Sequence, residues 1–104
     1  MEKLVPNLLL KNLQVWLGQL VYIHFEVNPG GYFRNGKALL NEVHVKGEGS
    51  NFRVYLELDE KDSIIHVDQL THMSITEGQI ILMGYDEHHR LARTLEISSE
   101  PFSM

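Results

Sequence analysis

"QLVYIHFEVNPGGYFRN", residues 19–35, contains the segment that decides the fold. From residue 21 to residue 27, apolar and polar side chains alternate strictly, which is the period of a β-strand with one buried face. The apolar positions are Val21, Ile23, Phe25 and Val27, and the polar positions between them are Tyr22, His24 and Glu26. Pro29 and Gly30 then favour a tight turn where this strand ends. The segment therefore predicts the first strand of an amphipathic sheet.

The same alternation recurs along the rest of the chain, separated by short polar connections. Further strands are predicted at "ALLNEVHVKG" (38–47), "FRVYLELD" (52–59), "SIIHVD" (63–68), "THMSIT" (71–76), "IILMGY" (80–85) and "LARTLEIS" (91–98), and residues 32–35 form a short strand or a loop. The segment 80–85 is apolar on both faces, which predicts a central position in the sheet.

One helix precedes the strands, because the apolar spacing changes before residue 19. Asn7 is a favourable cap, and Gly18 can take the left-handed conformation that ends a helix. The apolar side chains between them recur every three or four residues: Leu9, Leu13, Trp16, Leu17 and Leu20. We therefore predict a helix at about 7–18, a β region at 19–98 and a tail at 99–104.

The predicted fold class is mainly β. An N-terminal amphipathic helix is followed by six or seven antiparallel strands, which form a small barrel or sandwich. With 104 residues, the chain is expected to be a single domain over its whole length.

The composition excludes several classes of partner and chemistry. Fourteen acidic and nine basic residues give a net charge of −5, which disfavours binding to nucleic acid or to an anionic membrane. The chain has no cysteine, so it forms no disulfide and performs no thiol chemistry of its own. No apolar run approaches the ~20 residues of a membrane span, and no signal peptide is recognised. We expect a cytoplasmic protein.

Polar side chains on the predicted strand faces are the candidates for a binding site. A ligand site is predicted from aromatic, ionisable and basic side chains at Tyr22, His24, Glu26, Arg53 and Tyr55. Imidazoles also bind metals, and the candidates are His24, His44, His66 and His72, with Glu26 or Asp68 as a carboxylate ligand. No two of these histidines lie two residues apart in one strand, so a solvent-exposed sheet face is the better interpretation.

Two short motifs resemble functional loops but fit hairpin turns better. "DEHHR", residues 86–90, contains acid–base residue types but lacks the helical HExxH spacing of a zinc site. "GEGS", residues 47–50, lacks the third glycine and the following helix of a phosphate-binding loop. We predict no catalytic residue and no cofactor.

The sequence resembles the YojF-like family of small bacterial proteins of unknown function. The similar segments are "VYIHFE" (21–26), "GYFRN" (31–35), "VKGEGSNFRVYLEL" (45–58), "LTH" (70–72) and "LARTLEISSEPF" (91–102). The chain departs from the family pattern at Asn51 and Phe52, where the family has Pro-Tyr. The resemblance implies a mainly β fold without an established activity. It also implies a partner, because family members are often encoded beside a zinc-dependent deacetylase of bacillithiol synthesis.

Three hypotheses for function follow. The first is a non-catalytic cytoplasmic module that forms a homo-oligomer and assists a partner such as this deacetylase. The second is a small-ligand-binding protein, in which Arg53 holds a carboxylate or a phosphate. The third is a metal-dependent hydrolase, which requires that at least two of the four histidines converge on one ion.

Overall fold

The computed structural model describes residues 2–49, 51–59 and 63–101. Its elements are β1 (Glu2–Lys3), α1 (Pro6–Gln14), β2 (Leu20–Val27), β3 (Gly31–Glu48), β4 (Asn51–Leu58), β5 (Ser63–Leu70), β6 (His72–Thr76), β7 (Gln79–Tyr85) and β8 (Leu91–Ser98). All strand pairs are antiparallel, in the order β1-β6-β7-β8-β2-β3-β4-β5. The predicted class, a mainly β fold with a helix before seven antiparallel strands, is confirmed, and the two-residue β1 is an addition.

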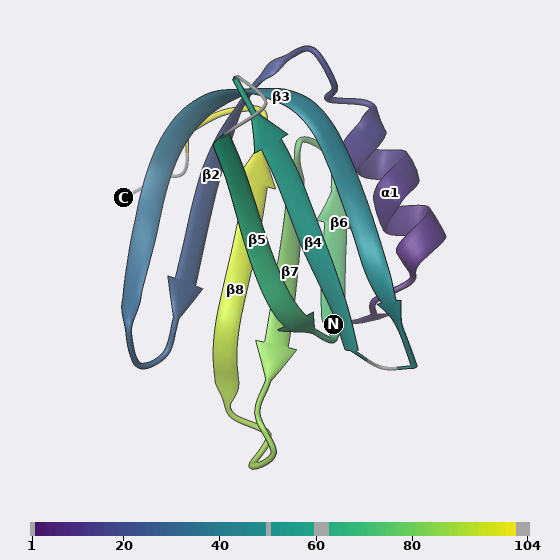
Figure 1. Cartoon of the computed structure of the whole chain (residues 1–104), viewed down its shortest axis with the longest axis vertical. Helices are drawn as coiled ribbons and strands as arrows, with labels where there is room; N and C mark the ends of the chain where they lie inside the picture. The colour runs from purple at the N-terminus through teal and green to yellow at the C-terminus, as the bar shows by residue number, and fades with distance from the viewer. Residues whose placement is uncertain (1, 50, 60–62, 102–104) are drawn as a thin grey trace.

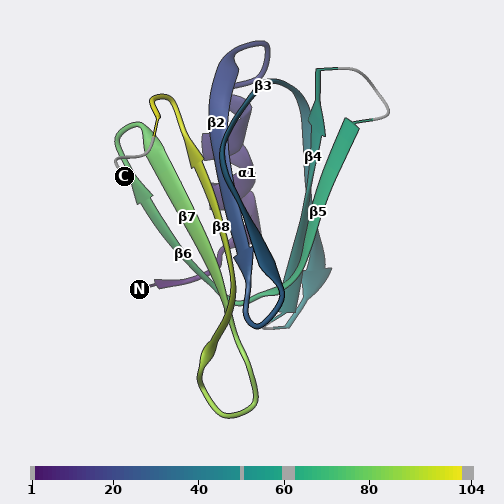
Figure 2. The same ribbon diagram turned by 90° about the vertical axis from the view of Figure 1, so that its left-hand side faces the viewer.

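The sheet folds into two layers that share β3 (Figures 1 and 2). The first half of β3 pairs with β2, and its second half pairs with β4. Figure 2 shows β6, β7, β8 and β2 on one side and β4 and β5 on the other, with α1 behind them. Since β1 and β5 end the strand order without pairing to each other, the sheet is an open sandwich and does not close into a barrel.

The hydrophobic core lies between the two layers and follows the predicted alternation. On β2, Val21 and Ile23 are buried, whereas Tyr22 between them and His24 after Ile23 are half-exposed. On β4, Val54 and Leu56 are fully buried and belong to the same core cluster. The predicted central strand β7 lies between β6 and β8, as expected from its apolar sequence.

The helix is shorter than predicted, because its last predicted turn belongs to the connection with the sheet. It begins at Pro6, which suits the first helical position because proline lacks an amide hydrogen, and it ends at Gln14. Beyond it, the Gly18 amide donates to the carbonyl of Leu40, so the chain already pairs with β3 there. Leu20 is consequently not on the helix but at the start of β2. Leu9 and Leu13 are fully buried. The predicted caps are wrong: the helix is capped at Val5 and Val15, Asn7 lies inside its first turn, and Gly18, with a left-handed φ of 80°, lies in the connection four residues beyond Gln14.

Residues 32–47 form one continuous strand instead of the two predicted segments. Arg34 and Asn35 together face His24 of β2, which is a β-bulge, and Asn35 absorbs it with a φ of 51°. Asparagine tolerates positive φ better than most residues, so the strand bends without ending. Among the described residues, no helix is long and apolar enough to cross a membrane. Of the predicted tail 99–104, residues 102–104 lie outside the described part of the chain.

The corner where β3 changes layers is held by Asp59. The Leu39 amide donates to Oδ1 of Asp59 over 2.8 Å, and the Asp59 amide donates to the Leu39 carbonyl over 2.8 Å. Asn41 is an extra residue in the register between β3 and β4, and its side-chain amide donates to the Asp59 carbonyl over 2.6 Å. Asp59 itself has a positive φ of 49°. These hydrogen bonds, which join residues 18 and 20 positions apart in the chain, therefore fix the bend that creates both layers.

Replacement of Asp59 tests this corner. We expect Asp59→Ala to lower the free energy of unfolding by about 1–3 kcal/mol. Alanine lacks the carboxylate that accepts the Leu39 amide hydrogen bond, and it adopts a positive φ less readily than aspartate does. Asp59→Asn keeps an oxygen acceptor and tolerates positive φ, so it should cost clearly less. Urea unfolding followed by circular dichroism measures both variants, and an alanine variant as stable as the wild type would contradict this role.

Candidate functional site

The predicted ligand-binding residues separate into two groups. Tyr22, His24 and Glu26 lie on the outer face of the first layer, where His24 is opposite Glu96 of β8. Arg53 and Tyr55 lie on the outer face of the second layer, because Val54 and Leu56 beside them point into the core. The core separates these two faces, so the five residues do not form one site.

The outer face of the first layer carries a ring cluster around Tyr32. The His24 and Tyr32 rings are 6.4 Å apart, and the Arg34 guanidinium lies 5.3 Å from the centre of the Tyr32 ring. A polar cavity of about 930 Å³ opens beside this cluster. Its ionisable lining residues are His24, Arg34, Glu77, Glu96 and Glu100. Of the predicted residues, only His24 reaches it, while Tyr22 and Glu26 do not line it.

The outer face of the second layer contains a row of three rings. His44 of β3 and His66 of β5 are both opposite Tyr55 of β4 in the strand register. The Tyr55 and His66 rings stack nearly in parallel, with centroids 4.3 Å apart and planes inclined by 13°. Stacking of this kind fixes the orientation of Tyr55 on an otherwise solvent-exposed sheet face.

Glu57 is a contributor to this face that the sequence reasoning did not select. Its Oε2 lies 2.8 Å from Nε2 of His44, which is hydrogen-bond distance. Both side chains remain partly exposed, at 43% for His44 and 26% for Glu57. The sequence does contain one indication of this role: Glu57 is two residues after Tyr55, so both side chains lie on the same face of the strand. The register that brings His44 beside Glu57 is not visible in the sequence.

A small cavity of about 270 Å³ lies beside this row, between the ring of Tyr55 and the side chains next to it. It is lined by His44, Lys46, Tyr55, Glu57 and Ile64. Arg53 faces a neighbouring cavity of about 630 Å³, together with Asp68 and Glu48. The second layer therefore offers an aromatic surface that has both cations and carboxylates at one end.

The four histidines proposed as metal ligands do not converge. His44 and His66 flank Tyr55, His24 lies in the other layer, and His72 of β6 hydrogen-bonds through Nδ1 with the Thr71 hydroxyl over 2.7 Å. Over residues 2–49, 51–59 and 63–101, no three His, Cys, Asp or Glu side chains are close enough to hold a metal ion. The convergence that a metal-dependent hydrolase requires is thus not found among these residues.

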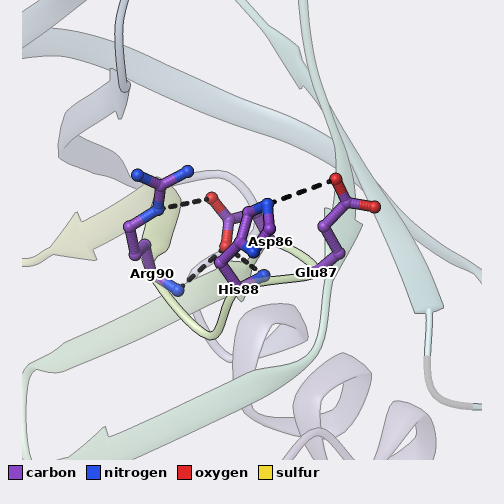
Figure 3. Close-up of polar contacts among 4 residues, drawn as sticks. All are labelled: Asp86, Glu87, His88 and Arg90. Atoms are coloured by element: carbon purple, nitrogen blue, oxygen red, sulfur yellow. Dashed lines mark hydrogen bonds and ion pairs between the residues drawn. The ribbon is translucent and has the colours of Figure 1, made fainter.

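The predicted hairpin loops lie where the sequence indicates. Residues 86–90 connect β7 to β8, and residues 47–50 include the turn between β3 and β4, of which Ser50 lies outside the described residues. In the first loop, Oδ1 of Asp86 accepts hydrogen bonds from the amides of His88 and Arg90, at 2.8 and 2.9 Å (Figure 3). The Arg90 Nε also donates to Oδ2 of Asp86 over 3.3 Å. These contacts give Asp86 a structural role in closing the loop.

The same contacts act on the charge of Asp86. The hydrogen bond from the Arg90 amide, followed by that from His88 and the charge of Arg90, holds the pKa of the Asp86 carboxyl below its ordinary value, against an opposing effect of desolvation. Because the pKa of Asp86 is lower in the folded chain than in the unfolded chain, these contacts stabilise the loop fully at pH values above the unfolded pKa. The stabilisation is lost as the pH falls through the folded pKa. The loop should therefore remain closed in mildly acidic solution.

An NMR titration of the Asp86 carboxyl carbon measures this effect directly. We expect its midpoint to lie below the ordinary aspartate value of 3.8, with the amide signals of His88 and Arg90 following the same midpoint. Asp86→Asn is the control, since it keeps an oxygen acceptor but cannot ionise, and it should abolish the transition at both amides. A midpoint at or above the ordinary value would show that the amides do not hold the carboxylate.

Comparison with known proteins agrees with the fold and the predicted resemblance. Residues 4–102 match a family described as proteins of unknown function, DUF1806. The chain is 28% identical to the uncharacterized protein YojF of Bacillus subtilis (strain 168), over 119 aligned positions that cover both chains fully. The crystal structure of Bacillus subtilis YojF superposes with a TM-score of 0.87 at 27% identity, covering 99% of this chain and 97% of that one. The resemblance is therefore confirmed, and the chain belongs to the YojF-like family of proteins of unknown function, DUF1806.

Proposed function

We propose that this chain is a non-catalytic cytoplasmic module that self-associates through the free edge of β5. The observation that carries the proposal is the last place of β5 in the strand order, with β4 as its one paired neighbour. An edge strand presents unpaired amide and carbonyl groups, which bind a further strand readily. Figure 1 shows β5 in front of β8, at the edge of the second layer.

The two edges of the sheet differ in their protection. The opposite edge ends in β1, which is two residues long and carries Glu2 and Lys3. Short length and charge are the usual means by which proteins keep an edge from pairing. The first half of β5, Ser63–Val67, contains no acidic residue, lysine, arginine or proline, and its Ile64 is 55% exposed. The β5 edge therefore lacks the protection that the β1 edge has.

A second copy of the chain is the simplest partner for this edge. Two β5 strands related by a two-fold axis pair antiparallel, so each contributes the same residues to the contact. Toward its end, Asp68 and Gln69 together face Arg53 as a bulge, and Gln69 has a φ of 55°. The bulge limits regular pairing to the first half of the strand. An interface of this length is small, so we expect a weak, concentration-dependent dimer.

Binding is proposed instead of catalysis because of the contacts of His44. Among the side-chain hydrogen bonds of the described residues, Glu57 is the one partner of His44. A His–Glu pair activates a nucleophile only when a hydroxyl or thiol is within hydrogen-bond reach of the imidazole. The pair is better suited to hold the shape of this face than to transfer a proton.

Sedimentation equilibrium of the untagged protein tests self-association. We expect the wild type to form a dimer at high concentration and Ile64→Lys to weaken it by about tenfold, because each edge then carries a charge. Leu20→Lys is the matched control, since Leu20 is 53% exposed but lies in the first layer. A wild type that stays monomeric throughout, or a Leu20→Lys variant that weakens the dimer equally, would contradict the proposed edge.

The deacetylase implied by the family resemblance is the second part of the proposal. Strand addition depends mainly on backbone hydrogen bonds, so the free β5 edge also suits a strand of a different protein. We expect the untagged chain and a zinc-dependent deacetylase of this type to elute as a complex in gel filtration, and Ile64→Lys to reduce that complex while Leu20→Lys retains it. Absence of a complex with the wild type would contradict the partnership, and its full retention by Ile64→Lys would contradict the use of this edge.

A further inference from the structure

Two cations lie directly opposite each other on the outer face of the second layer. Lys46 of β3 and Arg53 of β4 are partners in the strand register, and both side chains are exposed. Like charges at directly opposed positions of a sheet destabilise it. Among the ion pairs and side-chain hydrogen bonds of the described residues, none includes Lys46 or Arg53. The repulsion between them is therefore not relieved by a carboxylate contact.

Two acidic residues of the same face, unlike these two cations, do form hydrogen bonds. Glu42 and Glu57 are also direct partners across β3 and β4. Glu57 is hydrogen-bonded to His44, and Glu42 accepts a weak hydrogen bond of 3.4 Å from the Val43 amide. The acidic end of the face therefore has partners, and the basic end has none. In a chain with a net charge of −5, Lys46 and Arg53 therefore place two cations side by side, while the carboxylates Glu48 and Asp68 line the neighbouring cavity with Arg53.

An apolar cavity lies directly beside these cations. Lys46 lines the cavity of about 270 Å³ together with His44, Tyr55, Glu57 and Ile64. The Tyr55 ring is held by its stacking with His66, and His44 at the other side is held by Glu57. The walls are thus fixed before a ligand binds, which lowers the entropic cost of binding. A flat apolar group fits against Tyr55 and Ile64, and a negative group fits at the Lys46 end.

We propose that this face binds a small anion with a planar apolar body, such as an aryl phosphate or an aryl carboxylate. Lys46 supplies a point charge within this cavity. Arg53, its partner on β4, lines the neighbouring cavity and supplies from that side the paired N–H groups that hold a phosphate or carboxylate. Asp68 and Glu48 line the neighbouring cavity near Arg53, and Glu57 lies beside His44 in this one, so the anion belongs at the Lys46 end, away from these three carboxylates. The site shares Ile64 with β5, but it uses the outward side chain of this residue and not the backbone groups of the strand edge, so it does not depend on self-association.

Phenyl phosphate is the probe, with inorganic phosphate for comparison, both at ionic strength matched with sodium chloride. We expect phenyl phosphate at millimolar concentration to raise the melting temperature of the wild type, and inorganic phosphate to raise it less, because inorganic phosphate lacks the ring that contacts Tyr55. In two-dimensional NMR, the ring signals of Tyr55 should shift in a saturable manner.

The variant Lys46→Gln gives the decisive comparison, because two effects of opposite sign are expected. Without the probe it should melt above the wild type, since the opposed like charges are gone. With the probe it should gain less stability, and its apparent affinity should be about tenfold weaker. Arg53→Gln should behave in the same way. Lys37→Gln, an exposed lysine of β3 opposite Tyr22 in the first layer, is the matched control and should respond to phenyl phosphate like the wild type.

Several results would overturn the proposal. One is a wild type that phenyl phosphate neither stabilises nor shifts at Tyr55. Another is a Lys46→Gln variant that phenyl phosphate stabilises as much as the wild type. A third is a Lys37→Gln variant that loses as much of this stabilisation as Lys46→Gln does. Either result would indicate a general effect of anions on the surface. Because sedimentation without the probe reports on the β5 edge alone, failure of this proposal and failure of self-association are separate outcomes.

Discussion

The hydrogen bonds of Asp59 at the corner of β3 are the constraint on which the rest of the structure depends. They hold Leu39 and Asn41 at the point where one strand leaves the first layer and enters the second. On the other side of the corner, the Leu40 amide donates to the Gln19 carbonyl. A strand of this length would otherwise continue in one sheet, and its inner face would have no second layer to cover it. The bend thus creates the core and, with it, two separate outer faces.

These outer faces differ in chemistry because they are built from different strands. The first layer combines His24, Arg34 and several carboxylates around a large polar cavity. The second layer has a row of rings, with Glu42 and Glu57 toward one end and Lys46 and Arg53, together with Glu48 and Asp68, toward the other. Each face is rigid for the same reason: its strands are anchored by apolar side chains that alternate with the polar ones. A rigid polar face on a packed sheet is a common support for binding.

The open ends of the sheet are the reason why we propose association as the function. A closed barrel has no free strand, but the sandwich leaves β1 and β5 at its two ends. The chain protects β1 by length and charge and leaves the first half of β5 apolar. The unrelieved repulsion between Lys46 and Arg53 lies on the same layer and is a second local conflict. Conflicts of this kind are expected where binding, instead of stability, determines the residues.

By itself, the sequence determined the elements and their faces, because alternation and turn residues act over only a few positions. Val21 and Ile23 were assignable to the core in this way, as was the helix that buries Leu9 and Leu13. Only the tertiary structure decided which side chains meet across strands, because pairing joins residues far apart in the chain and shifts at the bulges of Asn35, Asn41 and Gln69. For this reason Arg53 and Tyr55 separate from Tyr22, His24 and Glu26. The contacts of His44 with Glu57 and of Lys46 with Arg53 appear only when the strands are in register.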